Sequence, residues 1–190
     1  MVLVLGAAFL LLIASLLIGS FTEPEFPPYV PTVALPAAVG DSLVGPAVYT
    51  LDASTTDRWR YFAFSRNSVV EAAEGGWDIA FRRFHLIVGE GGGIVDLGPA
   101  PFDSVTELPA SGYRGNDAGS DTTNPGVGKW YRYSTLSHLL TSKHHVYAVR
   151  TGRGKYAKLA ILAYYCRVVG TACITFRYAY QGDGSRRVAR

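Results

Sequence analysis

The chain has 190 residues, a length that suits one folded domain with some additional segments. Hydrophobic residues make up 48% and charged residues only 17%, which excludes a disordered chain. The 21 glycines and 10 prolines, beside a single methionine, disfavour a helical bundle and favour strands joined by turns. The net charge of +3 is unevenly spread, because residues 58–190 hold all 18 lysines and arginines.

The first segment, residues 2–21, is uncharged and rich in leucine, isoleucine and alanine. Twenty such residues in a helix reach across about 30 Å of hydrocarbon. A secretory signal is a poorer match because no basic residue precedes the apolar run. A lipoprotein signal is excluded because no cysteine lies near the end of that run. We therefore predict that residues 1–22 form an uncleaved transmembrane helix.

The charges beside this segment predict its orientation. Glu23 and Glu25 follow it, and the first basic residue is Arg58. Because loops kept in the cytoplasm are rich in lysine and arginine, the N-terminus is expected to be cytoplasmic and the rest translocated. The sequence thus predicts a single-pass protein of a bacterial inner membrane with a periplasmic domain.

A proline-rich linker is predicted for residues 23–46. Six prolines hold this stretch near the extended polyproline conformation. Two interpretations remain open: a plain spacer, or a segment that lies on a neighbouring protein through Phe26, Tyr29 and Val33.

Residues 47–190 carry the patterns of an all-β domain, an antiparallel sheet or sandwich. Strand-like runs are rich in aromatic and β-branched residues and are bounded by glycine, proline, asparagine or aspartate. The long stretch Pro99–Gly128 is predicted to be a surface loop, and Ser134–Ser142 a short helix. The predicted strands are Ala47–Leu51, Trp59–Phe64, Trp77–Val88, Trp130–Tyr133, Val146–Thr151, Tyr156–Cys166 and Ala172–Gln181.

The two cysteines, Cys166 and Cys173, end one predicted strand and begin the next. A hairpin would bring their thiols together, so we predict a disulfide. Disulfides persist in oxidising compartments, which agrees with translocation. A zinc site is disfavoured because a second pair of ligands is missing.

Catalytic and nucleotide-binding motifs are absent from the sequence. Gly89–Gly93 follows a predicted strand but does not match GxGxxG, and is better interpreted as a flexible turn. Asp117, Asp121 and Asn124 miss the spacing of a calcium-binding EF-hand loop. The predicted topology argues against nucleic acid as a partner of the basic residues. We expect no enzyme and no metal site.

Several sequence blocks together resemble the HmuY-like haem-binding family over residues of about 48–185. The resemblance implies an all-β, extracytoplasmic fold and, in the best known members, a haem held between two histidines. The blocks are Leu51–Ala53, Arg58–Phe62, Gly76–Phe84, Gly154–Leu159, Tyr164–Cys166 and Phe176–Gln181.

Four histidines, His85, His138, His144 and His145, are available as haem ligands. Tyrosine, phenylalanine and tryptophan could form the walls of an apolar slot. His144 and His145 would point to opposite faces of a strand, so at most one of them should serve. The candidate axial ligands are His138 and His145, and the only methionine, Met1, begins the apolar segment.

Two functional hypotheses follow. The favoured one is a non-catalytic accessory subunit of a larger integral membrane complex, such as a bacterial photosynthetic reaction centre with its antenna. In it, residues 2–21 contact the bilayer and other membrane subunits, the β domain docks on the extracytoplasmic face, and no cofactor is bound. The alternative is a membrane-tethered haem-binding protein, as the family resemblance implies.

Overall fold

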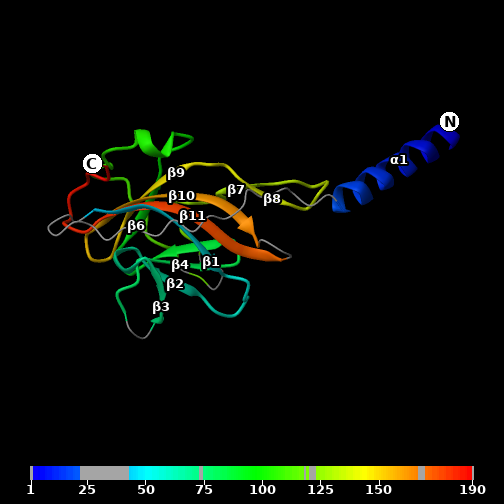
Figure 1. Ribbon diagram of the computed structural model, residues 1–190. Helices are drawn as coiled ribbons and strands as arrows, with labels where there is room; N and C mark the ends of the chain where they lie inside the picture. The colour runs from blue at the N-terminus through cyan, green and yellow to red at the C-terminus, as the bar shows by residue number, and fades with distance from the viewer. Residues whose placement is uncertain are drawn as a thin grey trace.

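The computed structural model describes residues 2–21, 43–72, 75–117, 119, 123–166 and 170–189. These residues contain one α-helix, α1, followed by a domain built mainly of β-strands (Figure 1). The predicted linker falls largely on residues 22–42, which lie outside this description. The elements are α1 (Val2–Phe21), β1 (Leu43–Asp52), β2 (Arg60–Ala63), η1 (Phe64–Arg66), β3 (Ser68–Val70), β4 (Ile79–Arg82), β5 (His85–Val88), β6 (Gly93–Asp96), η3 (Phe102–Ser104), β7 (Tyr131–Tyr133), β8 (Leu140–Ser142), β9 (Val146–Arg150), β10 (Tyr156–Tyr165) and β11 (Thr171–Gln181).

The strands form two main sheets and one separate hairpin. A five-stranded sheet has the order β1-β11-β10-β9-β6, and a four-stranded sheet has the order β3-β2-β4-β5. The hairpin pairs β7 with β8. All of these pairings are antiparallel, so the predicted all-β fold class is confirmed for the domain.

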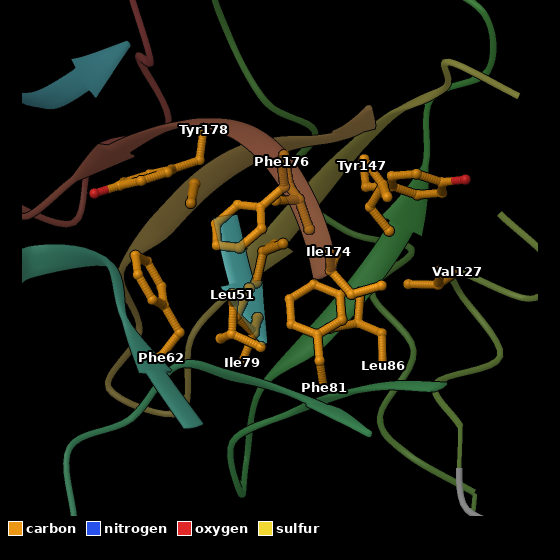
Figure 2. Close-up of a cluster of buried hydrophobic side chains, with 14 of the residues drawn as sticks. Leu51, Phe62, Ile79, Phe81, Leu86, Val127, Tyr147, Ile174, Phe176 and Tyr178 are labelled. Atoms are coloured by element: carbon orange, nitrogen blue, oxygen red, sulfur yellow. The ribbon is translucent and has the colours of Figure 1, made fainter. Parts of the chain in front are cut away.

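The main core lies between the two sheets and is rich in aromatic rings (Figure 2). Phe176 of β11 is at its centre, with ring centroids 5.1 Å from Phe62 and 5.5 Å from Phe81. Period-two alternation in β11 places Ile174, Phe176 and Tyr178 on the same buried face. Aromatic pairs at these separations add to the free energy gained by burying apolar surface.

A second layer covers the outer face of the five-stranded sheet. Phe102 of η3 packs with Val146, Ala160 and Ala179, which lie on that face of β9, β10 and β11. β9 and β10 are buried on both faces, which explains why their sequences show continuous apolar runs instead of clean alternation. The segment predicted as a surface loop, Pro99–Gly128, therefore supplies part of the cover.

Two predicted elements differ in the structure. Trp77–Val88 is not one strand but the hairpin β4–β5, in which Arg83 adopts a left-handed φ of 54° at the turn. Ser134–Ser142 is not a helix: it holds a turn and β8, with His138 in the turn at φ 58°. Both errors arise because pattern alone does not reveal a non-glycine residue that reverses the chain.

The domain also begins earlier than predicted and contains strands that the patterns missed. β1 starts at Leu43 instead of residue 47. β6 begins at Gly93, the last residue of the segment interpreted as a flexible turn, and it pairs with β9 from Gly93↔Arg150 to Asp96↔Tyr147. A Cβ on Gly93 would contact Tyr113, which explains why a small residue is needed there.

The helix α1 projects from the end of the domain where the β7–β8 hairpin lies (Figure 1). Its apolar side chains are exposed, for example Leu10 at 67% and Leu11 at 71%. A Cβ on Gly19 would lie 2.9 Å from the Leu136 carbonyl oxygen, so the helix closely approaches the hairpin turn there. Within the described residues, no helix combines the length and the apolarity that crossing a membrane requires. The predicted transmembrane span in residues 1–22 is therefore not supported.

The predicted disulfide is present. Cys166 and Cys173 are bonded, with their Cα atoms 4.8 Å apart. The bond joins Cys166, which directly follows β10, to Cys173, which lies inside β11 two residues past Thr171 of the last pair, Tyr165↔Thr171.

Candidate functional site

The two predicted haem-ligand candidates lie on separate elements. His145 immediately precedes β9 and is half-buried, whereas His138 lies in the exposed turn of the β7–β8 hairpin. In Figure 1 this hairpin reaches toward α1 and away from β9. The structure therefore does not pair the two imidazoles, and each has its own set of neighbours.

His145 is held by Asp96 at the end of β6. The Nδ1 atom of His145 lies 2.8 Å from Oδ2 and 3.0 Å from Oδ1 of Asp96. A carboxylate only accepts hydrogen bonds, so Nδ1 carries the proton and Nε2 is the nitrogen with a lone pair when the ring is neutral. Metal-binding histidines commonly have this second hydrogen bond, which orients the ring.

An aromatic ring lies beside this pair. Tyr147, two residues further along β9, has its centroid 6.3 Å from that of His145, and its side chain is buried in the main core. Burial raises the pKa of the Tyr147 phenol, and the Asp96 carboxylate raises it further, so the phenol stays protonated at neutral pH. His145 thus lies between a carboxylate and the edge of an apolar, aromatic core.

His138 has a different hydrogen-bond partner. Its Nδ1 atom is 2.6 Å from the hydroxyl oxygen of Tyr133, at the end of β7. Tyr133 and Leu136 are both about half exposed, at 53% and 52%. The hairpin therefore presents an imidazole, a phenol and an aliphatic side chain on an accessible surface.

The remaining two histidines are placed differently. His144 is exposed and has a left-handed φ of 55°, so its side chain and that of His145 do not follow the alternation of a strand. His85 begins β5 and stacks on Phe84, with centroids 4.5 Å apart. Among the described residues, no three histidine, cysteine, aspartate or glutamate side chains are grouped as a metal site.

Sequence reasoning missed the partners of the candidate ligands. Asp96 belongs to the unpredicted strand β6, and Tyr133 faces a turn that was expected to be helical. The segment GGGIVD does contain a short β-branched run before Asp96, which is a weak strand signal. Only the pairing of β6 with β9 places Asp96 beside His145.

The comparisons with known proteins agree with this fold. The family described as "HmuY protein" matches residues 111–178, a range that contains three of the four histidines and both cysteines. No curated protein matches the chain. The predicted HmuY-like resemblance is thus confirmed over the matched residues.

Solved structures resemble this domain over most of their length. An apo HmuY analogue of Tannerella forsythia has a TM-score of 0.61 and 18% identity, covering 70% of this chain and 94% of that one. A HmuY-like haem-binding protein of Bacteroides vulgatus, itself described as a candidate, has a TM-score of 0.61 and 16% identity, with coverages of 79% and 97%. A proposed lipoprotein of Bacteroides fragilis has a TM-score of 0.59 and 14% identity, with coverages of 78% and 95%. At these identities the likeness establishes the fold alone.

None of these three proteins is described as a subunit of a photosynthetic complex. The predicted reaction-centre host therefore has no support from the comparisons. The comparisons back the alternative hypothesis, a haem-binding protein, better than the favoured one, because one of these structures is itself described as a candidate haem-binding protein.

Proposed function

We propose that the β domain binds haem. The observation that carries this proposal is the Asp96–His145 hydrogen bond, which fixes one ring nitrogen and leaves Nε2 as the donor atom for iron. The pair lies in a domain whose fold is that of HmuY-like proteins, one of which is named as a candidate haem-binding protein.

The side chains near His145 fit such a ligand. A neutral imidazole is a common axial ligand of haem iron, and aromatic groups suit the flat apolar face of the porphyrin. Here His145 would supply the axial nitrogen and Asp96 would hold the ring, while the Tyr147 ring, 1% exposed, belongs to the core beside them. His138, held by Tyr133, is the second candidate ligand. In this role the protein would capture haem through its iron, and such capture needs no catalytic residue.

Titration of the purified protein with haemin tests the proposal. The wild type should give a saturable Soret band, and His145→Ala should shift this band and weaken binding by at least about tenfold. His138→Ala tests the second candidate in the same way. His144→Ala is the matched control, because it removes an exposed neighbouring imidazole and should change neither band nor affinity. A wild-type protein that leaves the haemin spectrum unchanged would refute the proposal.

We further propose that the domain works outside the cytoplasm. The Cys166–Cys173 disulfide supports this location, because such bonds form and persist in oxidising compartments. Accessibility of the domain to an added protease in intact cells, compared with lysed cells, tests the location.

A second candidate function is that of an accessory subunit in a larger assembly, and one observation favours it. Most large side chains of α1 are exposed, for example Val4 at 71% and Phe21 at 82%, and such an apolar surface is usually covered in a native protein. We propose integral membrane proteins as the partners that cover it. Purification of the full chain in mild detergent should then yield partners in fixed ratio, and a lone monomer would refute this function.

A further inference from the structure

The turn of the β4–β5 hairpin forms a pocket that is separate from His138 and His145. Its volume is about 330 Å³. The lining residues are Thr56, Arg82, Arg83, Phe84 and His85, so two guanidinium groups and an imidazole meet there and no carboxylate lines it. Arg58 and Arg60 lie outside this lining, and the Nε atom of Arg58 is 3.6 Å from Oδ2 of Asp57.

Arg82 is positioned by an aromatic ring. Its guanidinium carbon lies 4.7 Å from the centroid of the Trp59 ring, which is within the range of a cation–π contact. Arg82 is also directly opposite His85 in the β4–β5 pairing, so the two side chains share the outer face of the four-stranded sheet. The stacking limits the rotamers of a long side chain and lowers the entropy lost when a ligand binds.

Arg83 is positioned by its backbone. It adopts a left-handed φ of 54°, and its N–H donates to the Ala53 carbonyl oxygen at 2.9 Å. Its Nη1 atom donates to the Ser54 carbonyl oxygen at 3.4 Å. A guanidinium has five N–H donors, and this contact uses one of them. A non-glycine residue in this strained conformation indicates that the surrounding structure holds it there.

We propose that this pocket binds an oxyanion, namely a carboxylate or phosphate group of a small molecule. Arg82 and Arg83 would hold the group with charge-assisted hydrogen bonds, whose fork geometry matches both kinds of oxyanion. The Thr56 hydroxyl and the His85 ring complete a polar lining, and Phe84 forms an apolar side. Neither the family match, which begins at residue 111, nor the haem proposal includes this site.

Calorimetric titration of the full-length protein at constant ionic strength tests the proposal, with inorganic phosphate and citrate as separate probes. At least one probe should bind the wild type with a dissociation constant in the millimolar range or tighter. Arg82→Gln should weaken that binding by at least about tenfold, because a charge-assisted donor is lost. Arg82→Lys should weaken it less, since the charge remains but the fork is lost.

Arg187→Gln is the matched control, because it makes the same charge change at an exposed residue near the C-terminus. It should leave the affinity unchanged. Binding of phosphate alone, of citrate alone or of both supports the site and identifies the oxyanion it accepts. The proposal is overturned if neither probe binds the wild type at about 10 mM, or if Arg82→Gln and Arg187→Gln have equal effects. Thermal melts of each variant show that it is folded.

Discussion

Lys158 and Phe102, 56 residues apart in the sequence, form a buried contact that joins β10 to η3. The ammonium nitrogen of Lys158 lies 4.4 Å from the Phe102 ring centroid and donates to the Phe102 and Val105 carbonyl oxygens at 3.0 and 2.8 Å. Arg177 covers the same ring at 4.3 Å and bonds Asp103 through both terminal nitrogens. These contacts hold the long segment after β6 against the outer face of the five-stranded sheet.

This contact predicts a stability effect for Lys158→Met. Methionine keeps most of the apolar volume but leaves two carbonyl oxygens without their donor, so the free energy of unfolding should fall by about 1–3 kcal/mol. Urea denaturation of wild type and variant measures the difference. Lys129→Met, at an exposed loop position, is the control and should be nearly neutral. Equal midpoints for Lys158→Met and wild type would contradict a stabilising role.

A second prediction concerns Asp78, which is fully buried and directly precedes β4. Its Oδ2 atom accepts the Phe64 N–H at 2.8 Å, and its Oδ1 atom accepts a hydrogen bond from Arg153 at 3.1 Å. Burial raises the pKa of the Asp78 carboxyl above its usual value, while the Phe64 N–H and the Arg153 guanidinium oppose that rise. Removal of Arg153 should raise the pKa of Asp78 further.

Arg153→Met should therefore destabilise the protein in a pH-dependent way. At pH 7 the ionised Asp78 loses its counter-charge, and the free energy of unfolding should fall by about 1–2 kcal/mol, since the half-exposed arginine is partly screened by solvent. As pH falls through the raised pKa, Asp78 becomes neutral in the folded state, and the difference from wild type should shrink. Urea denaturation at pH 7 and near pH 4 checks this. A difference that is constant or larger at low pH would contradict it, and Arg132→Met is the control.

Sequence patterns predicted the central strands well because apolar runs rich in β-branched and aromatic residues are typical of strands buried in a sheet. β10 and β11 follow the predicted ranges within one residue at each end, and their disulfide follows from the hairpin that they form. The β4–β5 turn could not be predicted, because Arg83 reverses the chain in a conformation that favours glycine or asparagine. β6 was not predicted because its pairing partner, β9, is more than 50 residues away.

The candidate site was predictable only in part. A sequence shows which residue types can bind haem, and His138 and His145 stay predictions made from that chemistry. The sequence does not show which carboxylate will lie beside which imidazole, since that depends on the register Asp96↔Tyr147 across two strands. The sequence likewise did not predict the basic pocket. It placed Arg82 and Arg83 next to each other in one expected strand, where their side chains would have pointed to opposite faces.

The Cys166–Cys173 disulfide gives a third prediction. It closes a short loop, with a sequence separation of 7, so the chain-entropy account gives a stabilisation of about 2 kcal/mol. The double variant Cys166→Ala with Cys173→Ala should lower the free energy of unfolding by that amount and leave the fold intact. Treatment of the wild type with a reductant should give a similar loss, and the double variant should not respond to it. A response of the double variant would show that the reductant acts elsewhere.

The last prediction concerns Asp96 as a positioning residue for His145. Asp96→Asn keeps the size of the side chain but removes the negative charge that orients the imidazole and strengthens it as a donor to iron. Haem affinity should fall by about 10-fold or more, while a His145-dependent Soret band remains. Asp103→Asn is the matched control, because Asp103 bonds Arg177 on the outer face of the sheet and should leave haem affinity unchanged. If Asp96→Asn and Asp103→Asn bind haemin as the wild type does, while His145→Ala does not, then His145 acts without its carboxylate partner.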